Sequence, residues 1–263
     1  MILLVTQLVG NLLSIMALLY QRRYNKLHKS IYGLSYDTAV LNIARLSVDL
    51  YASFNYKFNI YVNKQLYAKF PLFYKDWDDI PVSMTLLITN ICLLVAYLSI
   101  WKQLMLYRAT SHTHQGVSMI CIVTLTVFLG LVGTATFYFY HVDPHHFTYL
   151  DHLNIMWVMG NMVGMVTLCP QICINWMGKC CSGISSRYIL TLIIADCVRW
   201  IGYTITAMKE SVEYWNWPFN SIPIVTTSAE LLCLVVILYQ AQFVYRGHKP
   251  TLPRISEKST ALV

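Results

Sequence analysis

Charged residues are scarce in this sequence. Asp, Glu, Lys and Arg make up only 12% of the 263 residues, whereas 57% are hydrophobic. A soluble domain has about 25% charged residues, so the composition excludes an ordinary soluble protein. A membrane-spanning helix needs about 20 mostly apolar residues. We therefore expect an all-α integral membrane protein with seven transmembrane helices, over residues 2–20, 34–56, 80–101, 117–140, 153–176, 187–208 and 221–244.

Features of a disulfide-rich or N-glycosylated protein are also lacking. Six of the eight cysteines fall within the expected spans, and Cys180 and Cys181 follow one of them, so no disulfide framework is expected. No Asn-x-Ser/Thr sequence occurs, and N-glycans are not expected. Residues 2–20 have neither a preceding positive segment nor a small-residue cleavage site. We interpret them as a span and not as a signal peptide.

Basic residues follow the first span directly, at Arg22, Arg23, Lys26 and Lys29. Cytosolic loops of membrane proteins carry the excess of Lys and Arg. We therefore expect a lumenal N-terminus and a cytosolic C-terminus, with lipid around the spans. The net charge of +7 is dispersed among loops, which indicates membrane topology and not a nucleic-acid partner.

An internal repeat is found when the sequence is compared with itself at an offset of 150 residues. Eight identities relate residues 8–37 to 158–187: Gly10/Gly160, Asn11/Asn161, Leu18/Leu168, Gln21/Gln171, Asn25/Asn175, Lys29/Lys179, Gly33/Gly183 and Ser35/Ser185. The two segments share one orientation, which predicts two parallel three-helix repeats joined by a linking helix, as in some transporters. The expected domains are the first repeat (1–108), the linking helix with a lumenal loop (109–150), the second repeat (151–246) and a cytosolic tail (247–263).

The segment "VTLCPQICINW" places Pro170 near the end of the fifth expected span. Proline has no backbone N–H, and its ring presses against the carbonyl four residues earlier, so we expect a kink. Such breaks persist in membranes where a neighbouring helix or a cavity satisfies the freed carbonyl. We interpret Pro170 as a hinge within the second half, near the cytosolic end of the fifth span, where a gate would bend.

Five ionisable residues lie at membrane depth: Arg45, Asp49, Asp196, Arg199 and Glu230. A charge at the bilayer centre costs about 3 kcal/mol on insertion scales and by default marks a functional pathway. Arg45 and Asp49 are four residues apart, and Asp196 and Arg199 three, so each pair can neutralise itself. Glu230 has no basic residue within a helical turn. An uncompensated carboxylate in a low dielectric holds a proton more tightly, which predicts that Glu230 loads and releases protons.

The repeat offers a second pairing of these charges. At the 150-residue offset, Asp37 corresponds to Arg187 and Asp49 to Arg199. Residues related by a pseudo-axis can meet across it, and such pairs would break and re-form as the halves move. Local pairing and pairing between the halves both stay open at this point.

The segments "CPQICINW…K…SGIS" and "YQRRYNKLHKSIYGLSYDTAVLN" resemble the paired PQ-loop signatures of the cystinosin family, proton-coupled exporters of cystine from lysosomes and vacuoles. The resemblance covers roughly residues 5–250. It implies a seven-span PQ-loop or SWEET-like fold with both PQ loops in the cytosol. It also implies a cystine-like amino acid and protons as the transported species, no cofactor or metal, and a lysosomal or vacuolar membrane location.

The resemblance also assigns residues. Asn42 matches the family's polar substrate-site residue in the second span, Asp79 the acid at the lumenal mouth of the third, and Asp37 the acid after Gly-x-Ser. Together with the intramembrane polar residues, this gives three expected sets: substrate-binding Asn42, Asn11, Asn161, Arg45 and Arg199; proton-coupling Asp79, Asp196, Glu230, Asp37 and Asp49; and hinge or gate Gln21, Pro170, Gln171 and Asn175.

The sequence departs from the family pattern in both halves. Tyr20 stands where the first motif has proline, so the first span should bend less. The family's lysines along the fifth span fall at Gly160 and Thr167, and its acids in the sixth and seventh spans fall at Leu192 and Leu234. Asp196 and Glu230 each lie one helical turn from those acidic slots, and we expect Arg45 and Arg199 to replace the lost lysines.

Other functions remain open. The same fold would serve a sorting receptor or scaffold without transport, or a SWEET-type uniporter. The tail "EKSTALV" is close to an acidic dileucine signal, which would bind cytosolic sorting adaptors. The strings "HVDPHH" and His112-x-His114 resemble histidine boxes, but metal ligands must converge and these would lie on opposite membrane faces. We therefore do not expect an enzyme.

Overall fold

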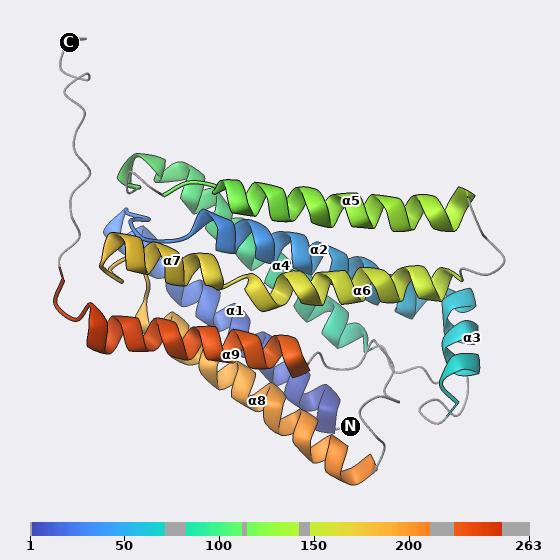
Figure 1. Ribbon diagram of the computed structural model, residues 1–263. Coiled ribbons are helices and arrows are strands. Elements are labelled where there is room, and N and C mark those ends of the chain that lie inside the picture. The colour runs from blue at the N-terminus through green and yellow to red at the C-terminus, as the bar shows by residue number, and fades with distance from the viewer. Residues whose placement is uncertain (1, 72–82, 112–114, 142–147, 211–223, 249–263) are drawn as a thin grey trace.

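The computed structural model describes residues 2–71, 83–111, 115–141, 148–210 and 224–248, and these form α-helices without strands (Figure 1). The α-helices are α1 Ile2–His28, α2 Tyr36–Phe58, α3 Ile60–Lys69, α4 Met84–Leu106, α5 Met119–His141, α6 Tyr149–Val166, α7 Cys169–Gly178, α8 Ser186–Glu210 and α9 Ile224–Tyr239. A short 3₁₀ turn, Arg108–Thr110, follows α4. A π-helical segment, Gln240–Val244, extends α9.

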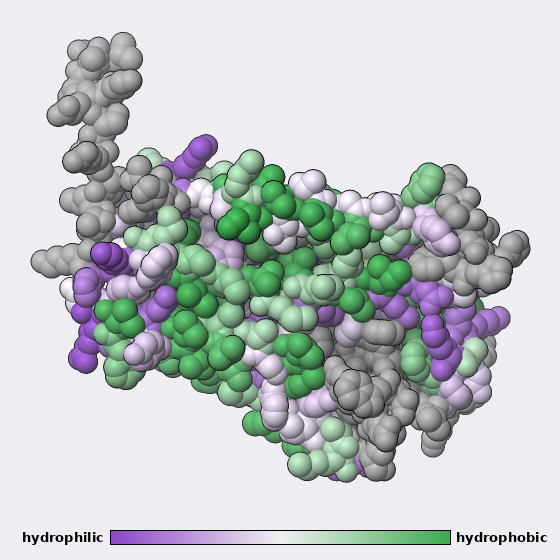
Figure 2. Space-filling view, viewed as in Figure 1, coloured by the Kyte–Doolittle hydropathy of each residue, from purple (hydrophilic) through white to green (hydrophobic). Residues whose placement is uncertain are grey.

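Among the described residues, six helical segments are long and apolar enough to cross a membrane: Ile2–His28, Met84–Leu106, Met119–Phe139, Tyr149–Gly178, Ser186–Lys209 and Ile224–Val244. Helix α2 has 23 residues and is therefore as long, but it is more polar because it contains Asp37, Arg45 and Asp49. On the face shown in Figure 2, hydrophobic residues cover much of the middle of the bundle, and hydrophilic ones gather toward its two ends. The protein is a multi-pass membrane protein.

The helices pack in matched pairs. Helices α1, α2 and α4 of the first half correspond to α6, α8 and α9 of the second. Within the halves, α1 packs on α4 and α2 on α4, just as α6 packs on α9 and α8 on α9. Between the halves, α1 packs on α8, just as α6 packs on α2. Helix α5 lies at the outside of the bundle, mainly against α6 (Figure 1). Side chains from α1, α2, α4, α8 and α9 meet in the main apolar core, around Ala17, Leu104, Leu234 and Ile237.

The expected break at Pro170 is confirmed. Helix α6 ends at Val166, and α7 begins at Cys169 with Pro170 in its first turn. Because Pro170 has no N–H, it cannot bond the Val166 carbonyl, and Thr167 and Gln171 instead bond carbonyls only three residues back. Helix α1 runs without interruption through Tyr20, as expected from the missing proline.

Residues 57–79 lie between the second and third expected spans, but the chain forms helix α3 within them, at Ile60–Lys69. Asn59 caps its start by accepting from Tyr61 N at 3.1 Å. Val62 and Leu66, four residues apart on one face, are buried against Leu150 and Leu153 at the start of α6. The helix exists because this apolar face has a partner, and the partner is distant in sequence.

Candidate functional site

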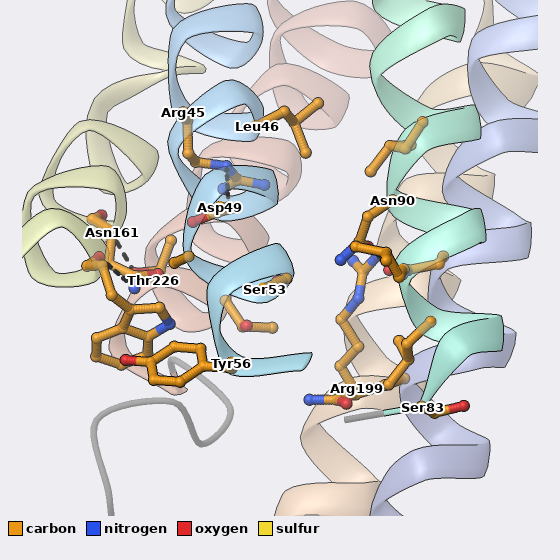
Figure 3. A pocket seen from close by; sticks show the side chains of 18 of the residues that line it. Arg45, Leu46, Asp49, Ser53, Tyr56, Ser83, Asn90, Asn161, Arg199 and Thr226 are labelled. Carbon is orange, nitrogen blue, oxygen red and sulfur yellow. Dashed lines mark hydrogen bonds and ion pairs between the residues drawn. The ribbon is translucent and has the colours of Figure 1, made fainter. Parts of the chain in front are cut away.

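A cavity of about 260 Å³ lies in the half of the bundle where α1, α4, α6 and α9 begin (Figure 3). Helices α1, α2, α4, α6, α8 and α9 all contribute to its wall. Its polar lining residues include Gln7, Asn11, Arg45, Asp49, Ser53, Tyr56, Asn90, Trp157, Asn161, Arg199, Thr226 and Glu230. Four of the five residues of the expected substrate-binding set, all but Asn42, therefore share one chamber.

Two arginines form the floor of this chamber with acids beside them. Arg45 forms an ion pair with Glu230, and its Nε lies 3.9 Å from Asp49 Oδ2. Arg199 Nη1 donates to Asp196 Oδ1 at 2.6 Å. We call these five residues the charged layer. Each guanidinium is partly buried, so its counter-ions offset a desolvation cost of several kcal/mol.

A second, smaller cavity of about 40 Å³ lies on the other side of the charged layer. Asn42, Tyr97, Thr167 and Asp196 line it, and Arg45, Arg199 and Glu230 line both cavities. A space of this size is large enough for water. Asn42 Nδ2 donates to the Thr38 carbonyl at 2.8 Å, so its orientation is fixed by its own helix.

The inference that Glu230 lacks a counter-charge is wrong. Its partner, Arg45, lies on α2, 185 residues earlier, and no local spacing could reveal it. The pairing of Asp49 with Arg199 between the halves is also absent from the described ion pairs, because Asp49 neighbours Arg45 and Arg199 binds Asp196. Asp196 and Arg199 therefore pair within one helix, whereas Glu230 pairs with a residue distant in sequence.

Buried amides hold the walls of the chamber at equivalent places in α1 and α6. Asn11 Nδ2 donates to Asn90 Oδ1 at 2.7 Å and to Thr89 Oγ1 at 3.2 Å. Thr226 Oγ1 donates to Asn161 Oδ1 at 3.3 Å. Asn11 also accepts from Arg199 Nη2 at 3.2 Å, so this amide joins three helices, α1, α4 and α8.

At the opposite end of the bundle, Gln21 of α1 binds the loop that precedes α8. Its Nε2 donates to the Gly183 carbonyl and to Asn25 Oδ1, both at 2.8 Å, and its Oε1 accepts from Ser185 N at 2.9 Å. Gln21 is 1% exposed. A buried side chain with three hydrogen bonds fixes this loop against α1.

Gln171 of α7 makes the corresponding bonds to the loop that precedes α2. Its Nε2 donates to the Gly33 carbonyl at 2.8 Å and to Asn175 Oδ1 at 3.0 Å, and its Oε1 accepts from Ser35 N at 2.9 Å. We call the two sets of bonds the glutamine clasps. Each clasp connects one half of the chain to the loop of the other half.

Several of the identities at the 150-residue offset occupy matching places. Asn25 and Asn175, besides accepting within the clasps, donate to Gln103 and Gln240 at 3.1 and 3.0 Å. Lys29 and Lys179 both adopt left-handed backbone, with φ of 48° and 46°. A Cβ added to Gly10 would lie 2.8 Å from Arg199 Cγ, and one added to Gly160 would lie 3.2 Å from Asp49 Oδ1. These glycines leave room for the equivalent positions 199 and 49.

Some expected site residues lie elsewhere. Asp37 is buried outside both cavities and accepts from Ser118 N at 2.9 Å, while Arg187, its expected partner, is exposed. Asp79, His112, His114, His145 and His146 lie outside the described residues, and the side chain of His141 is not described. Within the described ranges, no cluster of three or more His, Cys, Asp or Glu residues could hold a metal ion.

Several residues of the site were missed. Asn90, Tyr97, Trp157, Tyr56 and Thr226 line the cavities but have no local spacing that distinguishes them from other polar or aromatic residues in a span. Gln103 and Gln240 had a weak signal, because polar amides near the end of an apolar span are costly unless they are paired.

Comparison with known proteins finds a relative over the whole chain. It is the uncharacterized protein YCL002C of Saccharomyces cerevisiae, which is 36% identical over 262 residues, 97% of this chain and 99% of the yeast protein. The chain belongs to the family of that yeast protein. No model of an established protein family matches it.

Proposed function

We propose that this protein is a proton-coupled exporter of cystine or a related amino acid, with the seven-span, doubled fold of cystinosin-like PQ-loop proteins. The observation that carries the proposal is the charged layer, which separates two cavities and contains ionisable residues from both halves of the chain. Intramembrane charges that face a cavity mark ion and substrate pathways. No enzymatic activity is part of this proposal.

The matched contacts support the doubled architecture. The glutamine clasps, the paired asparagines and the pairwise packing of helices all relate the first three long helices to the last three. In parallel repeats, rocking of one bundle against the other opens a central site alternately to each side. The clasps bind both loops at one end of the bundle while the larger cavity lies toward the other end, which supports a carrier that is open on the side of the larger cavity.

The direction of transport rests on the distribution of basic residues. With the N-terminus in the lumen and the C-terminus in the cytosol, the larger cavity faces the lumen and the clasps face the cytosol. Protons from an acidic lysosomal or vacuolar lumen then reach Glu230 and Asp49, which line the larger cavity. Amino-acid release into the cytosol requires the clasps to open.

A receptor or scaffold without transport is the second candidate. It is favoured by the ion pairs of Arg45 and Arg199, because both guanidinium groups already bind carboxylates of the protein itself. Sorting adaptors at the tail belong to either proposal.

Flux measurements distinguish these candidates. Purified protein in liposomes is given labelled cystine or other amino acids, with and without an imposed pH gradient. We expect uphill accumulation only with the gradient. Gradient-independent flux would indicate a SWEET-type uniporter, and absence of flux for every amino acid would favour the receptor. Protein-free liposomes and a Gly130→Ala variant, in which the added Cβ would contact no other part of the chain within 4 Å, serve as controls.

A further inference from the structure

Arg45 stands between two carboxylates on different helices. Its Nη1 bonds Glu230 of α9, while its Nε is buried without a hydrogen-bond partner and lies 3.9 Å from Asp49 Oδ2. A guanidinium has five N–H donors, and an N–H···O bond forms near 2.9 Å. A displacement of about 1 Å would therefore give Asp49 the bond that it lacks.

The charges of the layer do not balance. Arg199 is occupied by Asp196 at 2.6 Å, so Arg45 alone serves both Asp49 and Glu230. Two cations face three carboxylates, and one proton neutralises the set. The titratable and charged groups around Glu230 are Arg45 and Asp49 from α2, Tyr97 from α4, Tyr188, Asp196 and Arg199 from α8, and Cys233 on α9 itself.

Among these carboxylates, only Glu230 lines both cavities. Asp49 lines the larger one and Asp196 the smaller one. A proton carrier must exchange with water on both sides of the barrier, and Glu230 alone has this position. Asp49 is instead placed to receive the cation when Glu230 is neutral.

Resting on the proton-coupled transport proposed above, we propose that Arg45 is the coupling switch, bound to Glu230 when that side chain is ionised and to Asp49 when Glu230 carries a proton. The proton comes from water in the larger cavity and forms the O–H of Glu230. Arg45 keeps its charge and transfers its hydrogen bonds to Asp49 on its own helix. Loss of the proton to the smaller cavity reverses the change.

This exchange has a mechanical consequence. Helix α2 packs chiefly on α4 and α6, and α9 chiefly on α8 and α6. Within the described residues, the Arg45–Glu230 contact is the one ion pair that joins α2 directly to α9. Transfer of Arg45 to Asp49 therefore removes a tie between the two halves of the chain when a proton is bound.

The pH dependence of flux tests the switch with Glu230→Gln, Asp49→Asn and the matched control Asp151→Asn, an acid outside both cavities. We expect E230Q to exchange substrate without pH dependence. In D49N, protonation of Glu230 leaves Arg45 without a counter-ion, so the pH midpoint moves at least about one unit to the acid side. D151N keeps the wild-type midpoint. An unchanged pH midpoint of flux in D49N would overturn the proposal. Loss of the pH dependence of flux in D49N would also overturn it, because Asp49 and not Glu230 would then carry the proton.

A second readout does not need transport. The infrared carbonyl band of protonated carboxyl groups is titrated in detergent-purified protein. We expect one titrating band to vanish in E230Q and to move to lower pH in D49N. If these shifts occur but the wild type moves no amino acid, the switch is supported and the proposed transport fails. If flux is proton-driven but the band is unchanged in both variants, the switch fails and the proposed transport stands. Should E230Q not fold, D49N decides alone.

Discussion

Gln171→Leu is the most direct test of the glutamine clasps. Leucine nearly conserves the side-chain volume but removes the amide that binds Gly33, Ser35 and Asn175. The structure gives three hydrogen bonds of 2.8–3.0 Å to this amide. The side chain is 3% exposed, so water cannot readily replace these bonds.

The magnitude follows from those bonds. Each contributes about 1 kcal/mol net, and a buried donor left without a partner, here Ser35 N, costs about 1–3 kcal/mol. We expect Q171L to weaken the clasped state by about 3 kcal/mol, which is about a 150-fold change in its equilibrium constant. The matched control is Gln242→Leu, the same change at an exposed position just beyond α9.

Two assays measure this change. Thermal unfolding in detergent should show a lower midpoint for Q171L than for Q242L. In a Cys181→Ser background, labelling of Cys180 by a membrane-impermeant maleimide should accelerate, because Cys180 is 2% exposed and shares a small pocket with Gly33. Equal midpoints and equal labelling rates in the two variants would refute the reasoning that the clasp closes this end of the bundle.

Three further predictions address other parts of the molecule. Gly10→Ala should displace Arg199 and lower the midpoint of thermal unfolding, because the added Cβ would lie 2.8 Å from Arg199 Cγ. In the control Gly130→Ala, the added Cβ would contact no other part of the chain within 4 Å, so the midpoint should stay unchanged. Equal midpoints in the two variants would contradict the close packing at Gly10. Leu66→Ala should detach α3 from α6 and lower the free energy of unfolding by about 2–5 kcal/mol. The control Ile60→Ala, at an exposed position of the same helix, should lower it by less than about 1 kcal/mol. Limited proteolysis that cuts both variants at the same rate would argue against this packing. Burial, and to a smaller extent the neighbouring Cys180, raises the pKa of the Cys181 thiol to about 11. The rate at which a maleimide labels Cys181 should therefore rise about tenfold for each pH unit between 7 and 10. A labelling rate that levels off at pH 9 would exclude this pKa.

Hydrophobicity located the helices well but not their ends. The first span was expected to stop at residue 20, yet α1 continues to His28. The apolar run indicates only the part of the helix that crosses the hydrocarbon layer. The helix continues past residue 20 because Gln21 and Asn25 are buried and hydrogen-bonded there. The break at Pro170 was predictable because its cause, the missing N–H, is local.

Identities within the repeat indicated residues but not their partners. Gln21, Gln171, Gly33 and Gly183 were all found by comparing the sequence with itself, but the crossing of each glutamine to the opposite loop was not. The Arg45–Glu230 pair was beyond sequence reasoning, because a nearer candidate, Asp49, lay one turn away on the same helix. A count of two cations against three intramembrane acids was the available signal.

The crossing of the clasps implies that the two halves cannot be released one at a time. The loop before α8 is held by α1, and the loop before α2 is held by α7, so withdrawal of either half pulls on both sets of bonds. Opening at this end should therefore be a cooperative, all-or-none event, and a lesion in one clasp should loosen the loop held by the other.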